Sequence, residues 1–568
     1  MALLFQNQNQ VKKRIGFNLI IIVGLVSLFS CSQKKQVDLI IHNAIVYTVD
    51  STFSTAESFA IKDGKFVAVG SNDDILKAYT AAKIIDANGK TIYPGFIDSH
   101  CHFYGYGKGL QKLDLSETTS FEEVIEKLIA FAKTNKSAWI IGRGWDQNRW
   151  AIKEFPTNKM LDSLFPNTPV FLGRIDGHAA LINSAAATKA NLDVNQKIAG
   201  GIIEIKNNKF TGILVDNAVE IVENSIPKET AEEIKSSLLA AEKNCFKVGL
   251  TTVDDAGLDK EVVELIDELQ KNNLLKMRIY AMLTDNKENL NYYLQKGFYK
   301  TDRLNVRSFK FYADGALGSR GACLLTPYTD KPNQQGFLLN TPRYFDSMAV
   351  IMAKNGFQMN THCIGDSAFR LIKRIYTAAI NNAIPKIADR RWRIEHAQVI
   401  AENDFTFPNN IKDESGKMVY AIIPSVQPTH ATSDMYWAKD RLGNDRLKYA
   451  YAYNDLLKTA GMVALGTDFP VEHIDPLYTF YAAVARKDLK GFPEGGFQPE
   501  NALSRENTLR GMTIWGAYAN FEEKEKGSIE VNKFADFIIL ENDLMNTDLK
   551  NIPSTRVLST FVNGEKVY

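Results

Sequence analysis

Cysteine, net charge and long hydrophobic runs are all scarce in this chain, and each scarcity excludes a class of protein. The 568 residues include five cysteines, at positions 31, 101, 245, 323 and 363, and such scattered thiols do not form a disulfide framework. The 67 basic and 66 acidic residues nearly cancel, so no general attraction to nucleic acid or acidic membranes is expected. Beyond residue 29, no apolar run approaches the roughly 20 residues that a spanning helix needs.

The exceptional apolar run lies at the N-terminus. Lys12, Lys13 and Arg14 precede an apolar stretch over residues 15–29, which is followed by Ser30 and Cys31. A basic start and a short apolar core are typical of a secretory signal. The terminal cysteine resembles that of a bacterial lipoprotein signal peptide over residues 1–31, which implies cleavage before Cys31 and acylation of that residue. The alternative is an uncleaved N-terminal anchor. Both place the remaining chain outside the cytoplasm, in the cell envelope, and tether it to a membrane.

Both ends of the remaining chain are rich in short strands and turns. With 45% hydrophobic and 11% aromatic residues, the chain can bury a large core and divide into more than one unit. Apolar alternation and the hairpin signals Asp63-Gly64 and Asn563-Gly564 occur in residues 37–93 and 515–568. We therefore expect the two arms to meet in one composite β-sandwich.

The middle of the chain, residues 91–514, alternates apolar strands with amphipathic helices. This alternation predicts an α/β fold, a (β/α)₈ TIM barrel. Residues 104–248 interrupt it after the first strand and carry strands of their own, so we interpret them as an inserted lid or substrate domain. The expected barrel strands are residues 91–97, 250–255, 277–283, 309–315, 357–362, 392–397, 419–428 and 462–468.

Histidine is also scarce, with eight in the chain, yet four of them end predicted barrel strands. His100 and His102 are two residues apart and so project to one face of an extended strand. A bare pair of this kind is equally compatible with two histidines that face water or pack against other residues. His362 and His396 end the fifth and sixth strands, and Asp468 ends the eighth. Because the carboxyl ends of barrel strands meet at one end, this set predicts a metal centre.

At these residues the chain resembles a known family. The stretch 94–102 (PGFIDSHCH), the later histidines and Gly466-Thr467-Asp468 are similar to the amidohydrolase superfamily. More narrowly, residues 309–320 and 176–184 resemble its amidohydrolase-3 branch, which includes N-substituted formamide deformylases. The resemblance covers nearly everything from Val37 to Tyr568 and agrees with the expected barrel and sandwich.

The resemblance implies roles for the metal-site residues. His100 and His102 would hold a more buried metal, His362 and His396 a more exposed one, and Asp468 would bind metal and relay protons. The expected cofactor is a divalent metal, one or two zinc ions. Lys310, within the fourth strand, stands where relatives carry a carboxylated lysine that bridges two metals. The alternative is an unmodified Lys310 paired with a carboxylate such as Asp468 or Asp314, which leaves a site for one metal.

Three further residues are candidates for substrate binding: His178, Asp314 and Arg320. His178 follows a strand of the insertion, where substrate contact and a structural hydrogen bond are both compatible with the pattern. For Arg320, which follows a glycine-rich turn, a structural ion pair is the alternative. His430 and His473 lie in loops after the seventh and eighth strands, where we expect them to be solvated. Contact with substrate is the alternative.

These expectations converge on hydrolysis. A metal makes hydroxide available near neutral pH and polarises a carbonyl, while Asp468 passes a proton to the leaving nitrogen. The predicted substrate is a small non-peptide amide or formamide. The alternatives are ester, cyclic-amide or deaminating hydrolysis or isomerisation at the same site, and a non-catalytic lipid-anchored binding protein. The expected partners exclude nucleic acid and include the membrane, and the sequence leaves a homodimer open.

Overall fold

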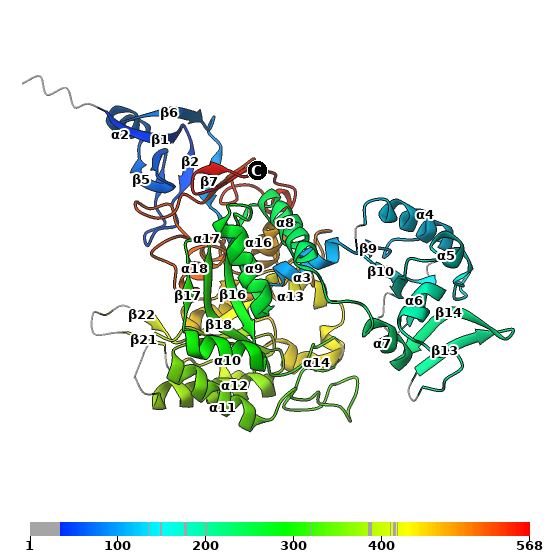
Figure 1. Cartoon of the computed structure of the whole chain (residues 1–568). Coiled ribbons are helices and arrows are strands. Elements are labelled where there is room, and N and C mark those ends of the chain that lie inside the picture. The colour runs from blue at the N-terminus through cyan, green and yellow to red at the C-terminus, as the bar shows by residue number, and fades with distance from the viewer. Residues whose placement is uncertain are drawn as a thin grey trace, which may run out of the picture.

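Three bodies make up the chain: a central barrel, a β-rich unit at one end and an insertion to one side (Figure 1). The computed structural model describes residues 34–135, 137–147, 150–174, 179–198, 201–318, 320–383, 389–408, 410–412, 416 and 418–568. The predicted signal peptide over residues 1–31 lies outside the described residues. Within the described ranges, no helix combines the length and hydrophobicity required to cross a bilayer.

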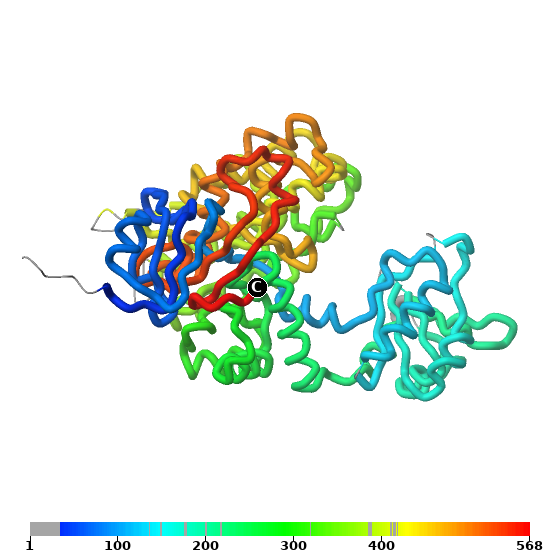
Figure 2. The backbone as a smooth tube through the Cα atoms, turned by 90° about the horizontal axis from the view of Figure 1, so that it is seen from above, coloured from blue at the N-terminus to red at the C-terminus, as the bar shows by residue number. Residues whose placement is uncertain are grey.

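The β-rich unit combines strands from both ends of the chain, and Figure 2 shows these ends side by side. Its first sheet has the order β5-β4-β1-β6, formed by β1 (Lys35–His42), β4 (Ser58–Lys62), β5 (Lys65–Gly70) and β6 (Tyr79–Asp86), with helix α2 (Asn72–Ala78). The second has the order β27-β26-β25-β7-β2-β3, formed by β2 (Ile45–Tyr47), β3 (Thr55–Ala56), β7 (Thr91–Pro94), β25 (Phe537–Leu540), β26 (Val557–Val562) and β27 (Glu565–Lys566). Phe59 and Phe537 meet edge to face with ring centroids 5.0 Å apart, so apolar packing joins the two arms.

The predicted TIM barrel is confirmed. Among the described residues, parallel strands follow the order β8-β15-β16-β18-β19-β20-β23-β24: β8 (Phe96–Cys101), β15 (Leu250–Leu258), β16 (Arg278–Thr284), β18 (Leu304–Tyr312), β19 (Gln358–Cys363), β20 (Trp392–His396), β23 (Ile422–Val426) and β24 (Ala464–Leu465). Their surrounding helices are α9 (Lys260–Lys271), α10 (Lys287–Lys296), α11 (Pro342–Asn355), α12 (Asp366–Asn382), α13 (Pro428–Asp434), α14 (Ala438–Leu447), α15 (Tyr453–Ala460), α16 (Pro476–Ala485), α17 (Arg505–Gly511) and α18 (Ile514–Ala519). Smaller elements are β17 (Tyr299–Lys300), β21 (Asn410–Lys412), β22 (Met418–Tyr420) and the 3₁₀ turns at Glu402–Asp404, Pro499–Asn501 and Leu549–Asn551.

The first predicted barrel strand is in fact two strands in two sheets. β7 belongs to the sandwich and β8 to the barrel, with Gly95 between them. A Cβ at Gly95 would lie 2.2 Å from Thr251 Oγ1, so only glycine allows this approach to the neighbouring strand. The sequence does not reveal the break at Gly95, because the residues on both sides are apolar and each half-strand is buried in its own sheet.

The barrel closes where its last strand meets its first. Asp468 N donates to His100 O at 2.8 Å, and His102 N donates to Phe469 O at 2.8 Å. A Cβ at Gly466 would lie 2.6 Å from His100 N, so the absence of a side chain there permits this contact. The closure therefore brings the segment that carries Asp468 beside the two histidines of β8.

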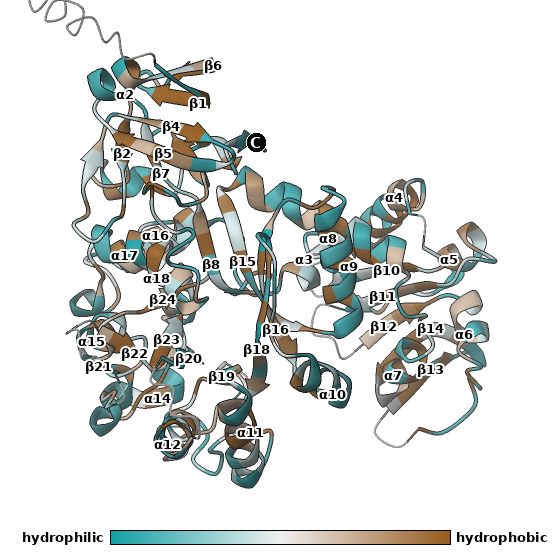
Figure 3. Cartoon of the chain, turned by 60° about the vertical axis from the view of Figure 1, so that its left-hand side comes forward, coloured by the Kyte–Doolittle hydropathy of each residue, from teal (hydrophilic) through white to brown (hydrophobic). Residues whose placement is uncertain are grey.

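The insertion is reached through α3 (Phe103–Leu110) and returns through α8 (Ala231–Lys247), and these helices pack against each other. Its mixed sheet has the order β13-β14-β12-β11-β10-β9: β9 (Leu113–Asp114), β10 (Ile140–Trp145), β11 (Val170–Arg174), β12 (Ala179–Ile182), β13 (Gly201–Lys206) and β14 (Lys209–Asp216). Helices α4 (Phe121–Ala132), α5 (Lys159–Leu164), α6 (Ser184–Lys189) and α7 (Asn217–Glu223) cover it. Trp145 and Trp150 are buried in its own apolar core. Figures 1 and 3 both show this sheet beside the barrel.

Candidate metal centre

His100 is held from two directions at the carboxyl end of β8. Its Nδ1 lies 2.6 Å from Glu395 Oε2, and its Nε2 lies 2.9 Å from Lys310 Nζ. Since Glu395 can only accept when ionised, the ring proton sits on Nδ1 and the lone pair on Nε2. Burial and then the neighbouring Lys310 lower the pKa of the imidazole, which keeps it in the neutral form that binds metals.

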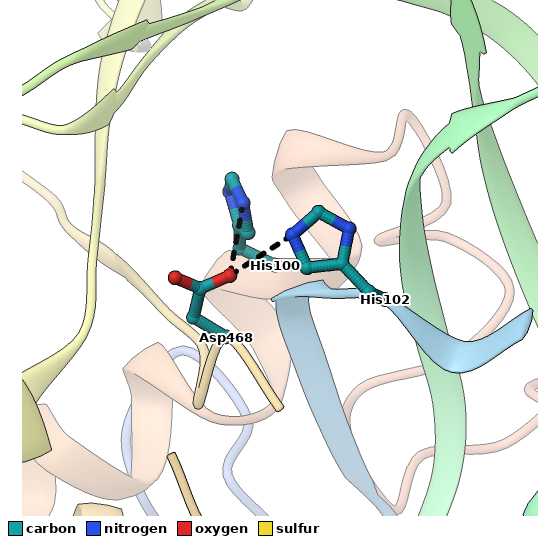
Figure 4. A group of neighbouring side chains, drawn as sticks. All are labelled: His100, His102 and Asp468. Atoms are coloured by element: carbon teal, nitrogen blue, oxygen red, sulfur yellow. Dashed lines mark ion pairs between the residues drawn. The ribbon is translucent and has the colours of Figure 1, made fainter. Parts of the chain in front are cut away.

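His102 and His100 converge on one oxygen of Asp468 (Figure 4). The Nε2 atoms lie 3.2 Å and 3.6 Å, respectively, from Asp468 Oδ1. The other nitrogen of His102, Nδ1, lies 3.0 Å from the carbonyl oxygen of Ala256 and so donates to it. Although burial alone would raise the pKa of Asp468, its hydrogen bond with His102 and the nearby histidines hold that pKa well below the usual value. The carboxylate is therefore ionised.

His396 is turned into the same cluster by the backbone at the end of β20. Its φ of +70° departs from the extended conformation, which redirects the side chain that follows Glu395. Nδ1 of His396 lies 2.8 Å from Gln427 Oε1, and its ring centroid lies 4.9 Å from that of His100. Burial and then His362 hold the pKa of His396 well below its ordinary value.

His362 stands next to His396, with ring centroids 4.4 Å apart. A hydrogen bond with the Gly315 backbone holds its ring, whereas its Nε2 is buried without a hydrogen-bond partner in the described structure. Burial, followed by Lys310, lowers the pKa of His362 to about 3. The neutral ring thus keeps one nitrogen free.

A common pattern links these histidines. Each uses one nitrogen for an acceptor or backbone group that fixes the ring, and in His100, His102 and His396 that nitrogen is Nδ1. Outer contacts of this type fix the tautomer and orientation of metal-binding histidines. His100, His102 and Asp468 place their ligand atoms within 4.8 Å of one another, which fits a divalent cation.

Lys310 is buried beside His100. Its Nζ donates to His100 Nε2, and burial lowers the pKa of the amine. This contact is with a histidine rather than with Asp468 or Asp314, the carboxylate partners of the structural alternative. Carboxylation of Lys310 stays a prediction.

The three predicted substrate-binding residues have different surroundings. His178 lies outside the described residues. Arg320 forms an ion pair with Asp330, at 3.1 Å from Nε to Oδ1 and 2.7 Å from Nη2 to Oδ2, as the structural alternative expected. Asp314 is buried and accepts from the backbone amides of Cys323, Ile364 and Gly365 at 2.8, 3.0 and 2.8 Å. Asp314 therefore fixes the loops beside His362. A substrate contact for Arg320 or Asp314 remains a prediction.

One expectation from the sequence is wrong: His430 is not a solvated loop residue. It lies on α13, is 8% exposed, and its Nε2 is 3.6 Å from Asp468 Oδ2. With His396 and Asp468 it forms a second group of ligand atoms within 4.8 Å of one another. The chain order conceals this position, because only the fold brings the start of α13 over the barrel end.

Sequence reasoning also missed the residues that orient the histidines. Glu395 is a charged residue inside an apolar strand, which is a signal of a buried partner. Asp98 accepts from Thr467 N, Thr467 Oγ1 and His100 N at 3.0, 2.7 and 3.3 Å, so it ties the closing segment to β8. Gln427 carries no local signal, since a glutamine before a short helix is common.

Comparison with known proteins agrees with this geometry. The model of the amidohydrolase family, Amidohydro_3, matches residues 83–568. Protein LONG AFTER FAR-RED 3 of Arabidopsis thaliana is 31% identical over 553 residues, which cover 94% of this chain and 91% of that protein. The N-substituted formamide deformylase of Arthrobacter pascens is 24% identical over 548 residues, covering 93% and 97% of the two chains.

A solved structure resembles the whole fold. An uncharacterized metal-dependent hydrolase from Pyrococcus horikoshii OT3 superposes with a TM-score of 0.75 at 26% identity, covering 90% of this chain and 99% of that one. The likeness therefore extends over the barrel, the sandwich and the insertion together.

Proposed function

This chain belongs to the amidohydrolase family, and from that premise we propose that it is a metal-dependent hydrolase of a carbon–nitrogen bond in a small non-peptide amide or formamide. The observation that carries the proposal is the cluster of histidines around Asp468, each fixed through one nitrogen. A structural core has no need of such an arrangement, because buried polar atoms without partners cost stability.

His100, His102, His362, His396 and Asp468 would hold one or two divalent cations, zinc being the expected metal, with Lys310 added if it is carboxylated. A bound cation of this kind supplies a Lewis acid and lowers the pKa of water. The burial of the imidazoles favours the neutral form, which is the form that binds metal.

Asp468 is the proposed proton carrier. Its low pKa leaves the carboxylate ionised near neutral pH, so it can accept a proton from the attacking water. The carboxylate then delivers that proton to the leaving nitrogen, which must be protonated to depart as an amine. His102 and His100, at 3.2 and 3.6 Å from Oδ1, orient the carboxylate.

The choice of an amide is supported by the relative from Arthrobacter pascens, whose name describes a deformylase of N-substituted formamides. Ester, cyclic-amide or deaminating hydrolysis at the same site is the second candidate, because one fold and one ligand set host many reactions. A lipid-anchored binding protein without turnover is the third. We also propose that Cys31 anchors the chain in the cell envelope.

The test is metal content by mass spectrometry on protein lacking residues 1–31, compared with His100→Ala, followed by a screen of formamides, linear amides and esters. Bound metal that decreases in the variant, with release of an amine from a formamide or amide, is expected. Metal with ester or deaminating turnover alone would favour the second candidate. Absence of bound metal after reconstitution would contradict the hydrolase and favour the binding protein.

A further inference from the structure

We propose that His396, His430 and Asp468 form a cation site of their own, so that the two oxygens of Asp468 serve two cations and Lys310 need not be a ligand. The inference deepens the proposed function and rests on it only in requiring a divalent cation at this end of the barrel. His430 is the new element, since neither the sequence motifs nor the family resemblance pointed to it as a ligand.

The two carboxylate oxygens face different histidines. Oδ1 lies 3.2 Å from His102 Nε2 and 3.6 Å from His100 Nε2, whereas Oδ2 lies 3.6 Å from His430 Nε2. Two ligands about 2.0–2.1 Å from a tetrahedral zinc ion are roughly 3.3–3.4 Å apart. The separation of Oδ2 from His430 Nε2 is thus close to that of two ligands of one ion and longer than a good hydrogen bond. A carboxylate shared in this way matches the bridging that two-metal sites require.

His430 has no other partner for the atom it turns toward Asp468. The residue is 8% exposed, and its Nε2 is buried without a hydrogen-bond partner among the described residues. Glu472 Oε1 is 4.0 Å from this nitrogen and accepts instead from Ser433 Oγ at 2.6 Å. A buried, unpaired imidazole nitrogen aimed at a carboxylate is what a ligand-binding position presents.

The segment at the start of α13 positions both histidines of the site. Gln427, the residue before the helix, fixes His396 through Nδ1, and His430 lies three residues further along. The two imidazole rings are nearly parallel, with an interplanar angle of 17° and centroids 5.8 Å apart. One short segment therefore orients one ligand and supplies the other.

Of the two groups of ligand atoms, the one that contains His430 can bind a cation without displacing an existing hydrogen bond. In the other group, the lone pair of His100 Nε2 already accepts from Lys310 Nζ at 2.9 Å, so a cation there must displace this contact. No such contact occupies His430 Nε2 within the described structure. We therefore expect the first equivalent of metal to bind at His396, His430 and Asp468 without carboxylation of Lys310.

The experiment uses the full-length chain, stripped with a chelator and titrated with Co²⁺ and Zn²⁺. Metal affinity and stoichiometry are followed by cobalt absorption and mass spectrometry, and the first site is located by anomalous diffraction at one equivalent. The variants are His430→Ala and His430→Gln, with Lys310→Met for the bridging alternative. The control is His473→Ala, because His473 Nδ1 accepts from Asp475 N at 3.1 Å and stands outside the ligand groups.

We expect both His430 variants to bind the first equivalent at least about tenfold more weakly, and Lys310→Met and His473→Ala to keep it. The anomalous peak should lie about 2.1 Å from the Nε2 atoms of His396 and His430. Thermal melting of the stripped proteins separates loss of a ligand from loss of the fold, and His430→Gln preserves a polar side chain if His430→Ala unfolds.

Two results would overturn the inference while leaving the proposed hydrolase intact. One is unchanged metal affinity in folded His430 variants with a raised KM, which would make His430 a substrate contact. The other is a first peak at His100 and His102, lost in Lys310→Met. Failure of the wild-type chain to bind either metal would refute this inference and the proposed function together.

Discussion

Arg278 at the amino end of the barrel and Asp468 at the carboxyl end are both buried charged residues, but their surroundings differ. Arg278 donates to both oxygens of Asp536 at 2.5 and 3.0 Å, to Asp302 O at 2.6 Å and to Asn563 Oδ1 at 2.6 Å. Asp468 instead faces histidines, and Nε2 of the nearby His362 and His430 lacks a hydrogen-bond partner in the described structure. Complete pairing is typical of a structural joint, here between barrel and sandwich, whereas buried nitrogens without hydrogen-bond partners are expected at a ligand-binding site.

The largest expected effect is on turnover, from Asp468→Asn. The amide keeps the shape of the side chain but removes the charge and the proton acceptor, so we expect kcat to fall by about a thousandfold. The measurement is hydrolysis of the best substrate from the amide screen. The matched control is Asp488→Asn, a half-buried carboxylate paired with Tyr436 Oη, which should retain activity. Equal activities of the two variants would remove Asp468 from the reaction.

Arg278→Met tests the other end of the barrel. The change leaves the Asp536 carboxylate buried without its cation, which we expect to lower the free energy of unfolding by about 3–5 kcal/mol. Urea denaturation measures the loss, and metal content should stay unchanged. Arg556→Met is the control, because that arginine pairs with Glu541 in solvent, where the charge is screened. Similar unfolding curves for both variants would refute the proposed joint.

Glu395→Gln probes the contact that orients His100. A neutral amide accepts more weakly from His100 Nδ1, now 2.6 Å from the carboxylate, so metal affinity should fall about 10- to 100-fold. Competition with a chelator of known affinity measures the change. The exposed Glu494→Gln is the matched control. An unchanged affinity would show that His100 holds its orientation without Glu395.

Asp254→Asn addresses the pH dependence of stability away from the metal centre. Burial raises the pKa of Asp254 to about 6, even though Arg393 opposes the shift. A folded-state pKa above the unfolded value of about 4 gives stability that is present at lower pH and is lost as the pH rises through about 6. The contribution changes by at most about 1.4 kcal/mol per pH unit.

We therefore expect the unfolding free energy of Asp254→Asn to vary less between pH 4 and pH 6 than that of the wild type. Urea midpoints at each pH measure the slope, with the exposed Asp548→Asn as control. Parallel curves for wild type and Asp254→Asn would contradict the raised pKa.

Much of the barrel was predictable because its strands are long, apolar and separated by amphipathic helices. The break at Gly95 was not, since a strand that leaves one sheet for another keeps the same apolar pattern. The order of the strands in the second sandwich sheet also depends on pairing between segments more than 400 residues apart, such as that of Tyr93 in β7 with Ile538 in β25.

For the site, the sequence identified His100, His102, His362, His396, Lys310 and Asp468 because polar residues that end apolar strands are conspicuous, and because the family resemblance gave them roles. It could not identify Glu395 or Gln427 as anchors, since their partners come from other strands. It placed His430 in solvent for the same reason. The sequence around a loop residue does not indicate which part of the fold will cover it.

The sequence by itself determined which polar residues end the barrel strands and the class of fold that holds them, because strand ends and apolar periodicity are local properties. Only the tertiary structure decided which nitrogen of each histidine is free, because this depends on hydrogen bonds between distant strands. It also decided that two histidines face one oxygen of Asp468 and a third faces the other. Barrel closure at Gly466 sets that arrangement, through the short distance between the last strand and the first.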